Sequence, residues 1–306
     1  MKPGLILVTG GRGQLACALE EAAGTRPLRR VGRPDWDFDR PDALPALLRA
    51  AAPALIVNAA AYTAVDKAES DAAAALRANR DGPRILAEYC AQAGIPLIQV
   101  STDYVFDGLK GAPYTETDPT NPTGVYGASK LAGEQAVLAS GARAIVLRTS
   151  WVYAASGKNF VLTMLNAAAR TDRLRVVADQ LGCPTAAQDL AAAILAIADR
   201  IAEGGWRNEY AGVFHAAGGG STSWHGLAHA IFTQAARHGG PMPAVDPIAT
   251  ADWPTPARRP PDSRLNCNKL QQVFGLQLPD WQDALARTID RVFFAPAPAS
   301  SSRVPV

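Results

Sequence analysis

The sequence predicts an α/β protein built on a doubly wound parallel sheet, with a smaller α/β domain toward the C-terminus. Two observations predict this fold class. Short apolar runs alternate with Ala/Leu-rich stretches of helical length over the first half of the chain, the order expected of β-α-β units. The chain has 306 residues, of which 48% are hydrophobic, so it can bury a core in each of two compact parts.

The first half supplies the predicted sheet. Residues 5–9, 55–57, 97–101 and 144–147 are short and almost wholly apolar, as buried parallel strands are, and residues 29–33 include the end of another strand. Helices are predicted at 14–23, 41–51, 66–93 and 126–139, and the third is expected to break near Gly82 and Pro83. We therefore predict a domain at residues 1–149. The glycine-rich turn described below indicates that this domain binds a dinucleotide.

The second half mixes helices with Gly- and Pro-rich connections. Helices are predicted at 159–170, 189–201, 224–236, 266–274 and 281–294, and a strand at 212–216. The Pro-rich segment 247–261 has no periodicity and is expected to be a loop, and residues 295–306 are expected to be a disordered tail. The second domain is placed at 150–294 and is expected to be interleaved with the first.

Charge and composition exclude several classes of function. The 30 basic and 28 acidic residues nearly cancel, so no nucleic-acid surface is expected. The four cysteines lie far apart without a Cys-x-x-Cys pair, which predicts reduced thiols and a cytoplasmic protein. The apolar run at 5–8 is too short for a signal peptide, and no stretch is long enough to span a membrane.

A glycine-rich turn follows the first strand. Gly10 and Gly13 precede Gln14, Leu15 and Ala16, where the first helix is expected to begin. Glycines let the backbone approach a pyrophosphate, and a helix N-terminus offers unpaired N–H groups to it. Because strand, turn and helix stand in this order at the start of the chain, we predict a Rossmann-type dinucleotide site; an ordinary Gly-rich turn is the alternative.

The second strand bears on the choice of cofactor. An acidic residue at its end usually binds the ribose of NAD, whereas arginine there favours the 2′-phosphate of NADP. Here Arg33 follows the strand and no acid comes before Asp35, so NADPH is predicted, with NADH left open. Small residues at 58–61 allow the nicotinamide half to lie close to the backbone; a packed helix start is the alternative.

A tyrosine and a lysine form the predicted chemical site. Residues four apart share one face of a helix, so Tyr126 and Lys130 can point into one cleft. Such a lysine, helped by an oxidised nicotinamide, lowers the pKa of a phenol from about 10 and makes it a usable general acid or base. Thr102 ends a strand at the edge of the sheet where ligands bind. An exposed tyrosine beside a surface lysine is the alternative.

Together, the glycine turn, the strand-end threonine and Tyr-x-x-x-Lys resemble the extended short-chain dehydrogenase/reductase superfamily. Longer segments at 57–69, 101–108, 148–153 and 254–260 look like the dTDP-4-dehydrorhamnose reductase family. The resemblance runs from the glycine turn to about Phe294. It implies that NADPH reduces the C4 ketone of dTDP-4-dehydro-L-rhamnose to dTDP-L-rhamnose, the last step in making that sugar donor.

The resemblance also implies roles for single residues. Tyr126 would protonate the C4 oxygen, Lys130 would hold the nicotinamide ribose, and Thr102 would hydrogen-bond the carbonyl. Asp103 and Trp151 match substrate-contacting positions. Positions that match cofactor contacts are Gly13, Gln14, Leu15, Asp37, Phe38, Ala61, Tyr62 and Thr63. Arg258 and Arg259 either reach the substrate diphosphate or form a salt bridge within a loop.

The resemblance bears on metals and assembly as well. Some members of the family dimerise through Mg²⁺ held by glutamates, but Ala18 and Gln188 stand at the matching places here, so the role of Mg²⁺ is open. We expect no metal at His225 and His229, which share a helix face but have no third ligand nearby. A monomer or a homodimer is expected.

Three other functions occur on the same fold. A 4,6-dehydratase has Asp-Glu directly after the strand-end threonine, whereas Asp103 is followed by Tyr104. A sugar-nucleotide epimerase is not excluded, although the long motifs fit a reductase better. A non-catalytic NADP-binding regulatory subunit is the alternative from another class, and the intact Thr102, Tyr126 and Lys130 argue against it.

Overall fold

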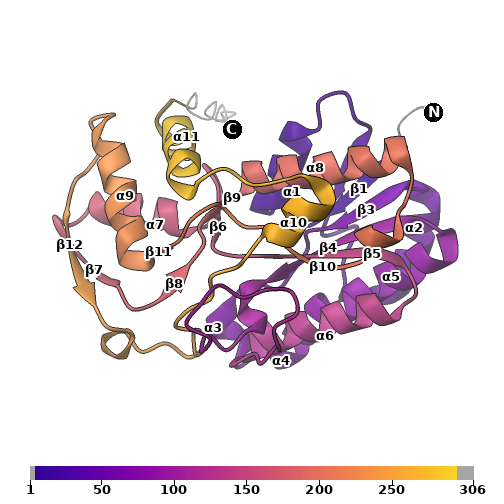
Figure 1. The fold of residues 1–306 in the computed structure, drawn as a ribbon, viewed down its shortest axis with the longest axis horizontal. Helices are drawn as coiled ribbons and strands as arrows, with labels where there is room; N and C mark the ends of the chain where they lie inside the picture. The colour runs from indigo at the N-terminus through magenta and orange to yellow at the C-terminus, as the bar shows by residue number, and fades with distance from the viewer. Residues whose placement is uncertain (1–3, 295–306) are drawn as a thin grey trace, which may run out of the picture.

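The protein is described by a computed structural model that covers residues 4–294 (Figure 1). The tail expected at 295–306 lies outside the described residues. None of the described helices is both long and apolar enough to span a membrane.

A six-stranded parallel sheet forms the centre of the larger part. Its strands are β1 (Ile6–Thr9), β2 (Leu28–Val31), β3 (Leu55–Asn58), β4 (Pro96–Thr102), β5 (Arg143–Thr149) and β10 (Gly212–His215), in the spatial order β10-β5-β4-β3-β1-β2. The chain adds β2 on one side of β1 and β3, β4 and β5 on the other, so the direction of winding reverses between β1 and β3. This reversal opens a crevice at the carboxyl ends of these two strands. The predicted doubly wound parallel sheet is thus confirmed.

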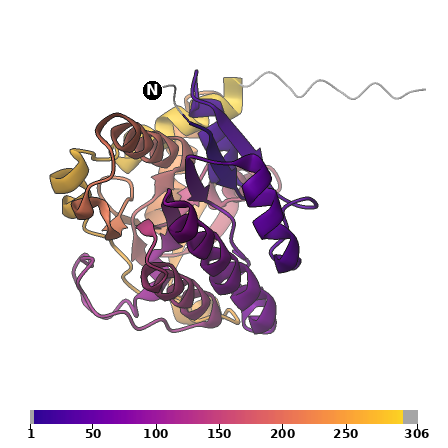
Figure 2. The ribbon, with the colours of Figure 1, turned by 90° about the vertical axis from the view of Figure 1, so that its right-hand side faces the viewer.

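Helices cover both faces of this sheet (Figures 1 and 2). Neighbouring strand residues point to opposite faces, so Leu7 and Val8 belong to different cores. Leu7 packs in the core formed with α2 (Leu44–Ala51), α5 (Gly82–Ala93) and α6 (Val125–Ala139). Val8 packs in the core formed with α1 (Gln14–Ala22), α8 (Ala187–Gly204) and α10 (Asn268–Phe274). Short 3₁₀ turns lie at η1 (Pro41–Ala43), η3 (Asp103–Val105) and η4 (Asn208–Tyr210).

A second, smaller group of elements lies at the left of Figure 1. Its helices α7 (Phe160–Ala168), α9 (Trp224–Ala236) and α11 (Trp281–Phe294) share a third core around Phe232, Trp281 and Leu285. Three strand pairs accompany them: β6 (Val152–Tyr153) with β9 (Thr185–Ala186), β7 (Arg173–Val177) with β12 (Ala244–Ile248), and β8 (Leu181–Gly182) with β11 (Thr222–Ser223).

The predicted helix at 66–93 is interrupted in a different place. It consists of α3 (Val65–Ala68), α4 (Ala72–Leu76), a π-helical turn η2 (Arg77–Asp81) and α5, so the break falls at residues 69–71. The chain does not leave the helix at the break expected near Asp81, Gly82 and Pro83; the irregularity there is the π-helical turn η2, which ends at Asp81. Pro83 follows this turn directly, and the altered hydrogen-bond pattern of the turn accommodates its missing N–H.

The prediction of a loop at residues 247–261 is wrong for its first two residues. Residues 247 and 248 belong to β12, which pairs in parallel with β7, a strand that was not predicted. Pro247 is tolerated because the two-stranded sheet leaves each strand with a free edge that needs no N–H. The rest of the segment contains only the 3₁₀ turn η5 (Thr250–Asp252).

Candidate active site

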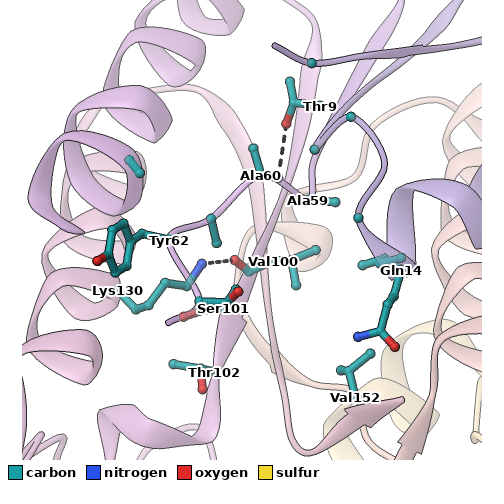
Figure 3. Close-up of a pocket in the computed structure, with 18 of the residues that line it drawn as sticks. Thr9, Gln14, Ala59, Ala60, Tyr62, Val100, Ser101, Thr102, Lys130 and Val152 are labelled. Atoms are coloured by element: carbon teal, nitrogen blue, oxygen red, sulfur yellow. Dashed lines mark hydrogen bonds between the residues drawn. The ribbon is translucent and has the colours of Figure 1, made fainter. Parts of the chain in front are cut away.

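A cavity of about 930 Å³ lies at the carboxyl ends of β1, β3, β4 and β5. This volume is typical of a cofactor or substrate site. Figure 3 labels four of the predicted site residues in the cavity wall, Gln14, Tyr62, Thr102 and Lys130. The predicted site residues that line the cavity are Gly10, Gly13, Gln14, Leu15, Arg33, Phe38, Ala61, Tyr62, Thr63, Thr102, Asp103, Tyr126, Lys130 and Trp151. Asp37, Arg258 and Arg259 are not among the lining residues.

The glycine turn leaves no room for side chains. Gly10 has a φ of +116°, and a Cβ there would lie 3.0 Å from the carbonyl carbon of Ala59. A Cβ on Gly32, after β2, would lie only 2.3 Å from the Cα of Gly11. Bare backbone therefore faces the cavity next to the N-terminus of α1, as a bound pyrophosphate requires.

Thr149, one of the residues that line this cavity, has a hydroxyl group without a hydrogen-bond partner in the described chain. Its Oγ1, at the end of β5, is buried. A buried polar group without a partner is destabilising, and a bound ligand can supply the missing hydrogen bond. The donor set and the glycine turn therefore fit a dinucleotide.

Arg33 lines the cavity but is held by acidic neighbours. Its Nε donates to Asp37 Oδ1 at 2.7 Å, and its guanidinium also pairs with Asp39. Asp39 in turn accepts a hydrogen bond from Arg77 Nε at 2.9 Å. Asp37 thus orients Arg33 rather than facing the cavity itself.

Tyr126 stands in the cavity wall at the start of α6. Burial raises the pKa of its phenol to about 12 and outweighs the hydrogen bond with Thr102, which lowers it. The ring meets Tyr104 edge to face, with the ring centroids 5.5 Å apart. The expected lowering of this pKa by Lys130 is wrong for the protein by itself: Lys130 is not among the groups that shift it, and burial raises the pKa instead.

Lys130 lies one helical turn further along α6, with only 4% of its surface exposed. Its Nζ donates to the carbonyl oxygen of Val100 at 2.7 Å (Figure 3). Burial lowers the pKa of this amine to about 8, and the nearby carboxylate of Glu134 opposes the shift. The ammonium group is thus fixed against β4, the strand that ends in Thr102.

A buried ion pair lies behind Lys130 and was missed in the sequence. Glu134 and Arg148 are 2% and 5% exposed in their side chains, and Arg148 Nη2 lies 2.6 Å from Glu134 Oε2. Ser101 Oγ also donates to Glu134. The sequence signal for this ion pair is a glutamate four residues after Lys130, together with an arginine inside an apolar strand.

Asn79 is a second residue that sequence reasoning missed. From the π-helical turn η2 its Oδ1 accepts the N–H of Tyr62 at 2.8 Å, and its Nδ2 donates to Tyr62 O and to Ser129 Oγ. These bonds hold the cavity segment that contains Tyr62 against α6. An asparagine in an otherwise Ala-rich helical stretch was the available signal.

Asp103 and Trp151 lie at the end of the cavity that carries Thr102. Asp103 is buried and accepts hydrogen bonds from Thr102 Oγ1 at 3.0 Å and Ser150 Oγ at 3.1 Å. Burial raises the pKa of its carboxyl group to about 6, against the effect of its hydroxyl donors. The buried carboxyl group of Asp103 and the half-buried indole of Trp151 therefore give this end of the cavity one polar and one apolar side chain.

The two arginines near position 259 lie apart from the cavity lining. Arg259 forms a bidentate ion pair with Asp66 of α3, with Nη1–Oδ1 and Nη2–Oδ2 distances of 3.1 and 2.9 Å. Arg258 is exposed on the same loop. Of the two roles weighed for Arg259, the salt bridge within the structure is the one observed.

Potential metal ligands are dispersed in the described part of the chain. No group of three or more His, Cys, Asp or Glu side chains within residues 4–294 could hold a metal ion. His225 Nε2 lies 3.0 Å from the carbonyl oxygen of Val245, and His229 is exposed. Ala18 is buried in α1, and Gln188 lies in the first turn of α8.

Comparison with known proteins gives one consistent family. Residues 4–294 match the model of the RmlD substrate binding domain. A dTDP-4-dehydrorhamnose reductase of Sinorhizobium fredii is 46% identical over 287 residues, which are 93% of this chain and 96% of that protein.

Solved structures of dTDP-4-dehydrorhamnose reductases are also similar. That from Bacillus anthracis, in complex with NADP, has a TM-score of 0.86 at 32% identity, over 94% of this chain and 98% of that one. The corresponding structure from Clostridium acetobutylicum has a TM-score of 0.85 at 36% identity, with the same shares of each chain covered.

Proposed function

The chain belongs to the dTDP-4-dehydrorhamnose reductase family, and on that premise we propose that it reduces the C4 ketone of dTDP-4-dehydro-β-L-rhamnose with NADPH. The product is dTDP-β-L-rhamnose, and this step completes the synthesis of that sugar donor. One observation carries the proposal: Thr102, Tyr126 and Lys130 line one end of a cavity whose other end is the glycine turn.

The reaction is divided among these three side chains. A nicotinamide dinucleotide, when bound, supplies the hydride. Tyr126, which is protonated at neutral pH as any phenol with a pKa of about 10 or above is, delivers the proton to the oxygen on which negative charge develops. The hydroxyl group of Thr102 hydrogen-bonds the same oxygen. Lys130 holds the nicotinamide ribose from the position that its bond to Val100 defines.

Asp103 and Trp151 are proposed to bind the sugar. The indole of Trp151 gives a flat apolar surface to the 6-deoxy side of the ring, and Asp103 supports Thr102 and Ser150 through its hydrogen bonds. Arg259 is proposed to hold its loop through Asp66. Arg258, exposed on that loop, is the remaining candidate for the substrate diphosphate.

NADPH is the proposed cofactor because Arg33 lines the cavity beyond β2. Its pairing with Asp37 and Asp39 leaves the Arg33 side chain 65% exposed, so a 2′-phosphate can reach it. The similar Bacillus anthracis structure contains NADP. Gly13, Gln14, Leu15, Phe38, Ala61, Tyr62 and Thr63 are the proposed further contacts. We also propose a reducing, cytoplasmic setting, since all four cysteines are free thiols.

Oxidation of NADPH on addition of dTDP-4-dehydro-L-rhamnose tests the proposal. Turnover is expected, and Tyr126→Phe is expected to lower kcat by about 10²–10⁴-fold, the range for loss of a positioned proton donor. Tyr89→Phe is the matched control, because Tyr89 Oη donates to Leu48 O on α2, at a distance from the cavity lining.

Two outcomes would count against the proposal. Binding of NADPH without any turnover would favour a non-catalytic NADP-binding subunit. Equal dissociation constants for NADPH and NADH would contradict the role of Arg33.

A further inference from the structure

We propose that Trp224 is a positioning residue for the sugar-nucleotide site: it holds the indole of Trp151 in the cavity wall, although Trp224 does not itself line the cavity. This inference rests on the proposed function, because it concerns the side chain assigned there to the sugar. It adds a residue from α9 to a site that the sequence motifs placed on β4, β5 and α6.

The backbone of Trp151 is in an unusual conformation. Its φ is +49°, in the left-handed region that bulky side chains rarely occupy. The other non-glycine residue with positive φ in the described chain is Ala52, which ends helix α2. Trp151 ends no helix; it follows Ser150, which is bonded to Asp103, and its carbonyl accepts the N–H of Thr185 at 3.3 Å. The surrounding structure therefore holds this residue in place.

The indole of Trp151 lies face to face on that of Trp224. The ring centroids are 3.5 Å apart and the planes differ by 7°. Trp224 is also in contact with Phe160, whose ring centroid is 4.7 Å away. One face of the Trp151 ring is thus covered by an aromatic cluster from the smaller group of elements.

Both the backbone and the indole of Trp224 are held in place. It is the first residue of α9, whose N-cap Ser223 accepts the N–H of Gly226 at 3.0 Å. Its indole N–H donates to Gln180 Oε1 at 3.2 Å, and Gln180 Nε2 donates to Thr250 Oγ1 at 3.0 Å. The ring that supports Trp151 is therefore a fixed platform.

Gly182 makes room for the same indole. A Cβ on Gly182 would lie 2.3 Å from Cε2 and 2.6 Å from Nε1 of Trp151, so any larger residue would displace the ring. Gly182 in β8 pairs with Thr222 in β11, two residues before Trp224. Strand β8 thus leaves the space for the ring, and its partner β11 leads directly into Trp224 of α9, which supports the ring.

Removal of Trp224 leaves the lining of the cavity chemically unchanged but frees Trp151 to turn or relax its backbone. The sugar then loses a pre-oriented surface, so its binding weakens. Cofactor binding is expected to stay the same, because the glycine turn and Lys130 lie on β1, α1 and α6.

Steady-state kinetics of Trp224→Leu test this inference. The KM for dTDP-4-dehydro-L-rhamnose is expected to rise about tenfold, the scale of an aromatic pair. The Kd for NADPH is expected to stay within about twofold, as for independent sites. Trp206→Leu is the matched control, since Trp206 is a half-buried tryptophan with an edge contact to Tyr210 and does not line the cavity.

Circular dichroism gives a readout that is independent of activity. Two indoles stacked face to face couple their absorption transitions and give a paired positive and negative band. This band pair is expected to disappear in Trp224→Leu and in Trp151→Leu and to persist in Trp206→Leu. Gly182→Ala keeps both tryptophans but displaces one ring, so it is expected to change the band pair and to raise KM as well.

The outcomes separate the inference from the proposed function. Turnover by the unsubstituted protein decides the proposed function alone. With turnover present, an unchanged KM in both Trp224→Leu and Gly182→Ala would overturn the positioning role. A parallel loss of NADPH affinity in both variants would also overturn it, because that pattern indicates a general structural defect.

Discussion

Burial shifts the pKa of three ionisable side chains around the proposed reacting centre. It raises the pKa of Tyr126 to about 12, lowers that of Lys130 to about 8 and raises that of Asp103 to about 6. In each case burial disfavours the charged form. At neutral pH the phenol and the amine remain mainly protonated and the carboxyl group mainly ionised, so the shifts narrow the range in which these groups are charged without changing their charge at pH 7.

Asp103 is expected to make the stability of the protein depend on pH. Because its pKa is raised in the folded state, the folded protein holds the proton more tightly than the unfolded chain between about pH 4 and pH 6. This contribution to stability is present at low pH and is lost as the pH rises through about 6. The free energy of unfolding of Asp103→Asn relative to the unsubstituted protein should therefore rise by on the order of 3 kcal/mol from pH 4 to pH 7.

Urea denaturation at several pH values measures this difference. The exposed Asp35, changed to asparagine, is the control, for which a nearly constant difference is expected. A difference for Asp103→Asn that stays flat over the same range would show that the carboxyl group titrates normally.

At the scale of elements, the site depends on the close approach of α6 to the π-helical turn η2. Gly133 lies inside α6, and a Cβ there would come within 1.9 Å of the carbonyl oxygen of Asn79. The same asparagine holds Tyr62 and Ser129 through its side chain. A glycine in a helix is therefore needed here for packing, although it weakens the helix.

Gly133→Ala is expected to destabilise the protein by about 1–3 kcal/mol, because overpacking outweighs the gain in helix propensity. That gain amounts to at most about 1 kcal/mol. Gly204→Ala is the matched control: it ends α8, and a Cβ there meets nothing within 4 Å, so no loss is expected. Unfolding in urea measures both variants, and a more stable Gly133→Ala would mean that the two helices do not touch.

At the scale of the whole molecule, both halves of the chain build the nucleotide-binding part. Strand β10 pairs with β5, and Ile194 of α8 packs in one core with Val8 and Leu19. Asn159 Nδ2 donates to Gln14 Oε1 at 2.8 Å, so the loop before α7 is bound to the start of α1. Arg26 also pairs with Asp199 of α8.

A fragment of residues 1–149 is therefore expected not to fold by itself. It lacks β10 and α8, which leaves the edge of β5 unpaired and one core uncovered. Thermal unfolding followed by circular dichroism is expected to show no cooperative transition for the fragment and one for the full chain. A cooperative transition in the fragment would show that the proposed boundary at 149 is a true domain boundary.

Much of the fold and part of the site could be predicted from the sequence. The order of strands and helices in the first half, the glycine turn and the Tyr126–Lys130 pair depend on residues within a few positions of one another. Such patterns are visible without a structure. Where local rules competed, as at Pro83 and Pro247, the prediction was wrong because tolerance of proline depends on the hydrogen bonds around it.

The sequence by itself determined the β-α order, the place of the glycine turn and which side chains are proposed to react. Only the tertiary structure decided which distant residues the side chains of the site contact. The pairing of Arg259 with Asp66 spans 193 positions, and the stack of Trp151 on Trp224 joins two different groups of elements. Burial of Lys130 and Asp103, and hence their pKa values, likewise follows from packing. Contacts between distant residues have no local pattern, because the folded backbone alone brings them together.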